Sequence, residues 1–519
     1  MTSQLPIRER AAADRPPAPT PERGARRRTL TAAPLALPAL AALLLGLWGL
    51  TRQGSLWRDE SVTWQVAHRP LDDLVALLGR IDAVHGLYYL LMHGVFALWD
   101  GGLVALRLPS VLATALAAAG VGALGALLAG RRAGVLAGVL FTLLPATQQY
   151  AQEGRSYALV TAGVVWGTYL FQRGKWSAYG VVLCLSCWLH EFAALALVAH
   201  GLTLAWLRVP RRTWLRWGTA AGAALFGVVP LAVLSAGQAE RQLGWLGRPG
   251  GAMWLQFAGV SALGVLLCRL TRRAAPGRAV SALALPLLIA PPGLLMTASL
   301  LKPWYVDRYV LYSLAGLALL GGLALDRALA DAGRLTPGAR VSAPEVRVVT
   351  ARGVRVLTAG VRVPLACLMA VAVAAVWLPF SLEVRSPQSR KDDVAAIAHA
   401  VARHARPGDA VLFLPARRRE WLMSYPRLYA RLDDVALART PAASRTLQGT
   451  ELPPGTIRHR LLSANRVIAL ADPEGQPLDP FEEEVVKRRT LAEGFRECGR
   501  ERVWGGQVVV YVRGGGCGG

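Results

Sequence analysis

Between residues 34 and 382 the chain alternates long apolar runs with short polar or basic segments. About 20 apolar residues cross the hydrocarbon core of a bilayer as a helix. The sequence is 53% hydrophobic with a mean hydropathy of +0.35, which excludes an ordinary soluble protein of 519 residues. We therefore expect a polytopic membrane protein with about 11 spans, at residues 34–50, 108–129, 133–145, 157–171, 176–189, 192–207, 217–236, 252–270, 280–300, 309–325 and 363–382.

Basic residues between the apolar runs indicate the direction of each span. Residues 1–33 are rich in Pro, Arg and Ala, so we interpret them as a disordered cytoplasmic tail that orients the first helix by the positive-inside rule. Arg131 and Arg132 then mark a cytoplasmic turn. The run 86–99 is apolar but short, and a span there would place Arg131 outside. We expect it to be interfacial or re-entrant.

The composition becomes that of a soluble domain near residue 384, on the outer side of the last span. We divide the chain into the tail 1–33, a membrane domain 34–383 and a small extracytoplasmic α/β domain 384–519. Periodicity predicts helices at 391–405 and 480–492 and strands at 410–414, 466–470 and 507–512. Cys498 and Cys517 can form a disulfide if this domain lies outside the cytoplasm.

Three other functional classes are disfavoured by composition and motifs. The net charge of +25 is carried mostly by topology signals between apolar runs, which argues against nucleic-acid binding. The sequence has no phosphate-binding loop of the type used by ATP-driven pumps. Cys184 and Cys187 have redox-like spacing but lie in an apolar helix, where packing is the simpler explanation.

Polar residues that are costly at membrane depth all fall on the expected outer side. Each one alone has an ordinary explanation, such as an ion pair, a helix cap or an interfacial anchor. Their convergence on one face predicts a site between the helices. The candidates are Asp59, Glu60, Gln152, Glu153, Arg155, Tyr157, His190, Lys302, Tyr305 and Arg308.

Transfer from a lipid-linked sugar phosphate fits this arrangement. The lipid tail would stay in the membrane while cations and tyrosines hold the phosphate, a role for Arg155, Lys302, Tyr305 and Arg308. A carboxylate opposite them can accept the proton of the acceptor hydroxyl as it attacks the anomeric carbon. A single attack from the far face inverts that carbon and needs no Ser or Cys nucleophile.

The chain resembles the GT-C membrane glycosyltransferases, in particular the protein O-mannosyltransferases and the aminoarabinose transferase of lipid A. The resemblance rests on short motifs over residues 34 to 325, at 57–60, 86–91, 106–110, 151–158, His190 and 305–309. Tyr88 belongs to the second motif. Many relatives have two prolines where this chain has His85-Gly86, which leaves the shape of the acceptor entrance open.

The resemblance implies a mainly α, GT-C-type bundle, a polyprenyl-phosphate sugar donor and an acidic residue of the first outer loop as the base. That role maps onto Asp59, with Glu60 beside it. We expect Asp59 to face Arg155 and the 305–309 loop, and Glu60 to support it. Some relatives use a divalent metal ion, which makes one possible here, but the sequence has no His/Asp cluster at metal-ligand spacing, so metal dependence is left open.

Two alternatives remain at this stage: a secondary transporter or lipid flippase, and a non-enzymatic protein whose outer domain binds the cell envelope. Transporters usually have internal repeats and charges near the bilayer midplane, and this chain has neither. Envelope binding does not explain Asp59, Arg155 or Arg308. The sequence leaves open the sugar (mannose or similar) and the acceptor (protein, lipid or glycan).

Overall fold

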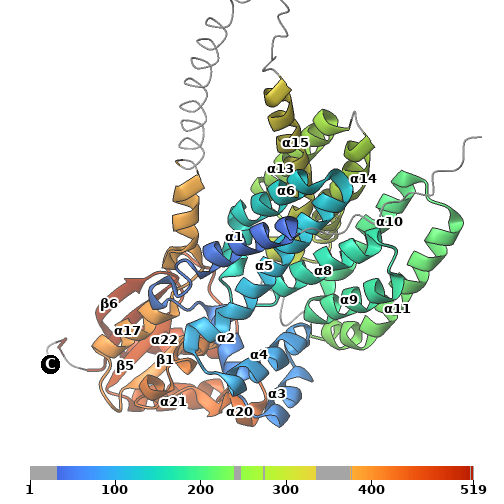
Figure 1. Ribbon diagram of the computed structural model, residues 1–519. Helices are drawn as coiled ribbons and strands as arrows, with labels where there is room; N and C mark the ends of the chain where they lie inside the picture. The colour runs from blue at the N-terminus through green and yellow to red at the C-terminus, as the bar shows by residue number, and fades with distance from the viewer. Residues whose placement is uncertain are drawn as a thin grey trace, which may run out of the picture.

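The computed structural model describes residues 32–238, 247–272, 275–334, 375, 377–514 and 516–517. A bundle of helices carries a small sheet domain at one end (Figure 1). We call this the domain end of the bundle. The helices of the bundle are α1 (Ala33–Leu47), α5 (Gly102–Ala129), α6 (Arg131–Leu143), α8 (Tyr157–Gln172), α9 (Trp176–Leu189), α10 (Leu195–Leu207), α11 (Arg211–Ala236), α13 (Gly251–Thr271), α14 (Ala275–Ala298) and α15 (Leu314–Arg334).

The fold is that of a multi-pass membrane protein. Within the described ranges, six helices are long and apolar enough to cross a membrane. Four others, α6, α8, α9 and α10, coincide with expected spans but have only 13 to 16 residues. The expected span 363–382 and the tail 1–33 lie mostly outside the described residues. The number of 11 spans therefore stays a prediction.

Helix α5 lies at the centre of the bundle, against α1, α6 and α8 (Figure 1). Small residues allow this close packing. A Cβ at Gly122 would lie 1.9 Å from the carbonyl oxygen of Pro34, and a Cβ at Gly134 would lie 2.4 Å from the carbonyl oxygen of Gly122. Because backbones approach closely there, side chains at these two positions would force the helices apart.

Three short helices cover the domain end: α2 (Arg58–Ala67), α3 (Leu71–Leu78) and α4 (Gly86–Leu98) (Figure 1). Helix α4 corresponds to the apolar run that was expected to be interfacial. It has 13 residues, packs against α2 and is too short to cross a bilayer. The loops before α2 and after α7 (Pro145–Ala151), together with η4 (Asp307–Ser313), meet at the same end.

The C-terminal domain contains a five-stranded sheet in the order β2-β1-β5-β7-β6. Its central strands β1 (Ala410–Leu414), β5 (Arg466–Ala471) and β7 (Gly506–Val512) confirm the three predicted strands. Strand β1 is parallel to β5 and to β2 (Asp433–Asp434), whereas β7 is antiparallel to both β5 and β6 (Arg496–Val503).

Helices pack on both faces of this sheet. Alternate residues of β1 and β5 face α17 (Val394–His404) and α18 (Glu420–Met423) on one side. The intervening residues face α21 (Pro454–Ser463) and α22 (Glu482–Gly494) on the other side. Helices α17 and α22 correspond to the two predicted helices.

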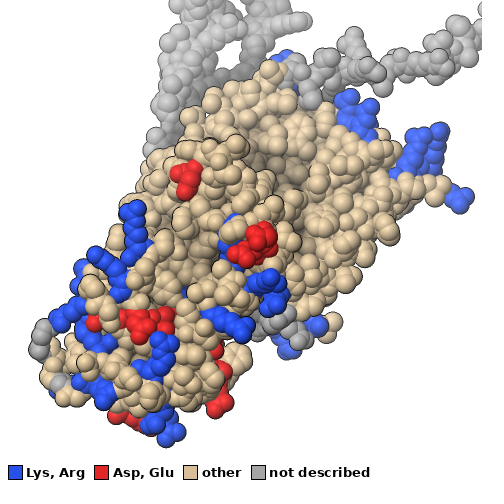
Figure 2. All heavy atoms as spheres, turned by 90° about the horizontal axis from the view of Figure 1, so that it is seen from below, with Lys and Arg blue, Asp and Glu red and all other residues tan. Residues whose placement is uncertain are grey.

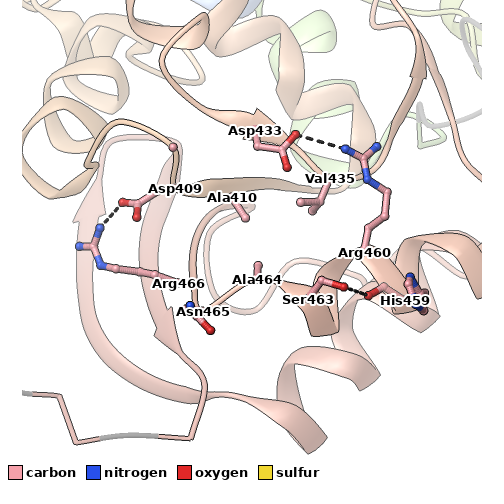
Figure 3. A pocket seen from close by; sticks show the side chains of 11 residues that line it. Asp409, Ala410, Asp433, Val435, His459, Arg460, Ser463, Ala464, Asn465 and Arg466 are labelled. Carbon is pink, nitrogen blue, oxygen red and sulfur yellow. Dashed lines mark hydrogen bonds and ion pairs between the residues drawn. The ribbon is translucent and has the colours of Figure 1, made fainter.

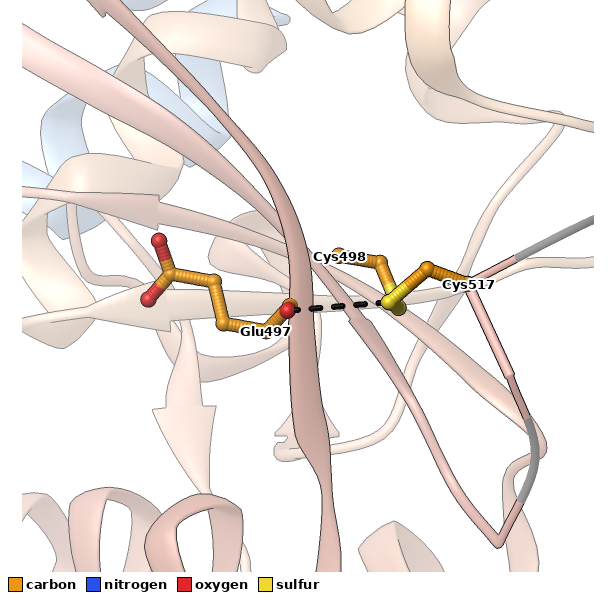
Figure 4. Close-up of a disulfide and its surroundings, with 3 residues drawn as sticks. All are labelled: Glu497, Cys498 and Cys517. Carbon is orange, nitrogen blue, oxygen red and sulfur yellow. Dashed lines mark hydrogen bonds between the residues drawn. A yellow bond between two sulfur atoms is a disulfide. The ribbon is translucent and has the colours of Figure 1, made fainter.

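Cys498 in β6 and Cys517 form a disulfide, with their Cα atoms 5.1 Å apart, as predicted (Figure 4). The remaining short elements of the domain are η6 (Pro387–Ser389), η7 (Ala416–Arg419), α19 (Pro426–Tyr429), β3 (Leu437–Arg439), α20 (Pro441–Ser444) and β4 (Thr450–Glu451). Charged side chains gather over the C-terminal domain, while most of the bundle surface in the same view is uncharged (Figure 2). This distribution fits a domain in water attached to a bundle in lipid.

Candidate active site

The first turn of α2 carries the two candidate carboxylates. The chain is extended at Trp57 (φ −112°, ψ 168°) and turns into helix at Arg58. Acidic residues at this position are favoured by the positive end of the helix dipole. Because neighbouring residues of a helix point about 100° apart, Asp59 and Glu60 meet different surroundings.

Glu60 is enclosed by arginines and has no exposed surface. Arg52 Nη2 donates to Glu60 Oε2 at 2.7 Å, and Arg107 donates to both carboxylate oxygens at 2.7 and 2.8 Å. The backbone N–H of Gly154 adds a further hydrogen bond at 2.9 Å. Burial alone would raise the pKa of Glu60, but Arg107 and Arg52 outweigh it and lower the pKa to about 2. Glu60 thus ties α2 to α5 and to the loop before Arg155.

Asp59 faces the 305–309 loop. Its Oδ2 accepts a hydrogen bond from Arg308 Nη2 at 3.3 Å, and its side chain is 25% exposed. The guanidinium of Arg308 lies over the rings of Trp57, Tyr157 and Tyr309, 5.5 to 5.8 Å from their centroids. Arg308 Nε also donates to the hydroxyl of Tyr157 at 3.1 Å. The carboxylate of Asp59 is therefore accessible while the cation is held in place.

Arg155 lies on the other side of the same turn. Its Nη1 donates to the hydroxyl of Tyr89 at 3.1 Å, to Thr63 Oγ1 at 3.3 Å and to the carbonyl oxygen of Asp59 at 3.5 Å. The hydroxyl of Tyr89 in turn donates to Asp82. The buried Nε of Arg155 makes no hydrogen bond in the described part of the chain. Asp59 therefore lies beside both arginines, but its carboxylate contacts Arg308, as expected from the sequence, whereas Arg155 contacts only its backbone carbonyl.

His190 lies among aromatic rings next to these arginines. Its ring centroid is 4.3 Å from that of Tyr309 and 5.7 Å from that of His85. Burial, and to a lesser extent Arg155 and Arg308, lower the pKa of His190 to about 3. The imidazole is thus neutral at physiological pH and adds no charge to the site.

Two other candidates, Gln152 and Glu153, lie in the loop that also carries Arg155 and hold this loop in place. Gln152 donates to the carbonyl oxygens of Gly46 and Trp48, at the end of α1. Glu153 is buried 3.2 Å from Arg390, a residue of the C-terminal segment. Burial raises the pKa of Glu153, although Arg390 opposes the shift. These contacts hold the loop after α7 against α1 and the C-terminal segment.

The structure does not bring every candidate into the site. Lys302 is exposed after the end of α14, and its ammonium group makes no hydrogen bond or ion pair with the described residues. Tyr305 packs against the apolar core of the bundle, and Tyr88 is fully buried beneath the site. Among the described residues, no group of three His, Cys, Asp or Glu side chains is placed to hold a metal ion.

Several residues of the site were not among the sequence candidates, including Arg52, Arg107, Tyr89 and Arg390. Arg107 offered a usable signal in the sequence, because it is the only charged residue of the apolar run that forms α5, and such residues are seldom without function. Arg390 is separated by 237 residues from Glu153, so no local pattern could have paired them.

A cavity of about 510 Å³ lies within the C-terminal domain at the start of strands β1, β2 and β5 (Figure 3). Its charged side chains pair with one another: Asp433 with Arg460 at 3.2 Å, and Asp409 with Arg466. Glu420 and the contacts to α2 follow the opposite end of β1. The cavity is therefore separate from the site around Asp59.

Comparison with known proteins supports the fold assignment. No family model and no curated protein matches the sequence significantly. Among solved structures, the chain is similar to ArnT from Cupriavidus metallidurans bound to undecaprenyl phosphate (TM-score 0.56, 14% identity, covering 93% of this chain and 98% of that one). The apo form of the same ArnT gives a TM-score of 0.53 at 15% identity, with 91% and 97% covered.

A third match, to the oligosaccharyltransferase of Archaeoglobus fulgidus, has a TM-score of 0.44 at 13% identity, with 85% and 70% covered. ArnT, the lipid A aminoarabinose transferase, has the GT-C fold. From its helical bundle, its small C-terminal sheet and this likeness over nearly the whole chain, we conclude that the protein has the GT-C fold of polytopic membrane glycosyltransferases.

Proposed function

We propose that the protein is a membrane glycosyltransferase that moves a sugar from a polyprenyl-phosphate donor to an acceptor outside the cytoplasm. The observation that carries this proposal is the accessible Asp59 carboxylate in contact with Arg308, with Arg155 beside the same turn. A base and phosphate-binding cations are the groups that such a transfer needs. The similarity to an ArnT bound to undecaprenyl phosphate supports the choice of donor.

Arg308 is suited to hold the donor phosphate. Its guanidinium is fixed by aromatic rings and by Tyr157, yet its bond to Asp59 is long at 3.3 Å. The singly charged phosphodiester of the donor would compete for this cation and free the carboxylate. The base would thus become available when the donor is bound.

Asp59 then accepts the proton of the acceptor hydroxyl as that oxygen forms a bond to the anomeric carbon. The bond from the anomeric carbon to the phosphate oxygen breaks, and its electron pair stays on the polyprenyl phosphate. Arg308 and Arg155 stabilise this leaving charge. The fixed carboxylate also stabilises the positive charge that develops on the sugar ring. A single displacement inverts the anomeric carbon.

The sugar is proposed to be mannose or a related hexose or pentose, and the acceptor a protein, lipid or glycan. Arginine and carboxylate side chains recognise the phosphate and the attacking hydroxyl, which all these donors and acceptors share.

The first test is Asp59→Asn, which keeps the shape of the side chain and removes its basicity. Membranes that contain the variant are supplied with polyprenyl-phosphate sugars, and sugar transfer is measured. Binding of undecaprenyl phosphate to the variant is measured separately. We expect turnover to fall ~100-fold or more, as for loss of a general base. Binding should be retained, because Arg308 and Arg155 remain.

The matched control is Asp72→Asn, an exposed aspartate on the neighbouring helix α3. It should behave as wild type. Near-normal transfer by the Asp59→Asn protein would refute the role of Asp59 as the base.

A further inference from the structure

The C-terminal domain contacts helix α2, which carries Asp59. Glu420, at the start of α18, is buried, and its Oε2 accepts a hydrogen bond from Arg58 Nε at 2.8 Å. Arg58 directly precedes Asp59 in the chain. The two residues of this ion pair are 362 positions apart, so the contact exists only because the domain is docked on the bundle.

Further hydrogen bonds fix the same turn. Asp392 Oδ1 accepts from the backbone N–H of Arg58 at 2.8 Å, while its Oδ2 accepts from the indole of Trp421 at 3.0 Å. The backbone carbonyl of Glu420 accepts from Ser61 Oγ and from Gln65 Nε2, both at 2.8 Å. The first N–H of α2 and one side of the helix are thus bound by the C-terminal domain.

The contact continues into the apolar core. Leu56, Val62 and Val66 belong to the same buried cluster as Ile397 and Trp421 of the C-terminal domain. Burial of these side chains opposes separation of the domain from α2. The C-terminal domain therefore contacts the first turn of α2 through both hydrogen bonds and apolar packing.

We propose that Glu420 is a positioning residue, which acts through Arg58 to hold Asp59 toward Arg308. This inference rests on the proposed function, in which Asp59 is the base. Glu420, and more weakly Asp59, raise the pKa of Arg58, so the guanidinium is already within electrostatic reach of Asp59. Without Glu420, Arg58 would be free to pair with Asp59 and would draw the carboxylate away from the acceptor.

The test is Glu420→Gln in the full-length protein, assayed with the same polyprenyl-phosphate sugars. We expect kcat to fall by ~10- to 100-fold, the cost of displacing a reacting group by about 1 Å, with little change in the KM for the donor. Removing a negative charge beside the base should also move the acid limb of the kcat–pH profile to lower pH. Hydrogen–deuterium exchange of the peptide 56–66 should increase.

Arg58→Gln is the complementary variant, and it keeps the test decisive if Glu420→Gln does not fold. It should also lower kcat, but it should move the acid limb to higher pH, because Glu420 is then unpaired. The double variant should be no slower than the slower single variant if the two residues act as a unit. The control is Glu482→Gln, an exposed glutamate on α22.

Unchanged kcat and unchanged exchange of residues 56–66 in Glu420→Gln would overturn the inference. Additive losses in the double variant would do the same. If Asp59→Asn abolishes transfer while Glu420→Gln does not affect it, the inference fails and the proposed function stands. Full activity of Asp59→Asn would instead remove the proposed function itself.

Discussion

Asp59 and Glu60 are adjacent in the chain, and the structure gives them opposite surroundings. Glu60 is buried and forms ion pairs with Arg52 and Arg107, whereas Asp59 is partly exposed and forms one long ion pair with Arg308. A carboxylate that is fully satisfied by buried cations is a poor base, because protonating it would leave those cations unpaired. The geometry thus favours Asp59 as the base, with Glu60 holding the turn in place.

This difference leads to a prediction for Glu60→Gln. The change leaves Arg52 and Arg107 buried without an anionic partner, which costs about 3 to 5 kcal/mol when one member of a buried pair is removed. We expect a lower melting temperature and less folded protein in detergent, whereas Asp59→Asn should melt like wild type. A Glu60→Gln protein with wild-type thermal stability would contradict the role assigned to this residue.

His190 predicts a pH dependence of stability. Its folded-state pKa of about 3 lies below the ordinary histidine value of about 6.5, so the unfolded chain takes up the proton first as the pH falls. The stability that neutral His190 contributes is complete above about pH 6.5 and is lost as the pH falls toward 3. Near pH 5 the loss should reach about 2 kcal/mol.

The test for this effect is His190→Phe, which keeps a ring against Tyr309 and cannot titrate. Its melting temperature should fall less than that of wild type between about pH 7.5 and pH 5. The buried His85 is unchanged in both proteins and serves as a common background. Equal falls in the two proteins would contradict the assignment.

At the scale of elements, periodicity located most of the fold. The central strands β1, β5 and β7 are continuous apolar runs, and their predicted bounds match the structure to within one residue. Strand β6 was missed because its sequence, RECGRERV, is mostly charged and has no buried face to reveal it. Its place at the edge of the sheet explains that composition.

The candidate site was also predictable in part from the pattern of polar and apolar residues. Charged residues next to apolar runs gave Asp59, Arg155 and Arg308, because such residues are rare in membrane proteins without a function. The contacts of α2 and of the loop after α7 with the C-terminal segment were not predictable, since Arg58–Glu420 and Arg390–Glu153 join residues more than 200 positions apart. The phosphate-binding role of Lys302 stays a prediction, because the residue is exposed and the charge pattern does not reveal which way its side chain points.

At the scale of the whole molecule, the site and the C-terminal domain share one end of the bundle. Helix α5 begins near α4 at the domain end and has 28 residues, or about 42 Å of helix. Arg131, which follows it, therefore lies at the opposite end of the bundle. Basic residues there and a disulfide-bonded domain at the other end together predict that the domain end faces out of the cytoplasm.

Cysteine labelling in intact cells tests this orientation. The background protein keeps the Cys498–Cys517 disulfide and has its other four cysteines replaced by alanine. Gln476 lies in an exposed turn of the C-terminal domain, and Arg131 is exposed at the start of α6. A membrane-impermeant maleimide should label Gln476→Cys in intact cells and Arg131→Cys only after permeabilisation. The reverse pattern would place Asp59 and Arg308 on the cytoplasmic side and would contradict an extracytoplasmic acceptor.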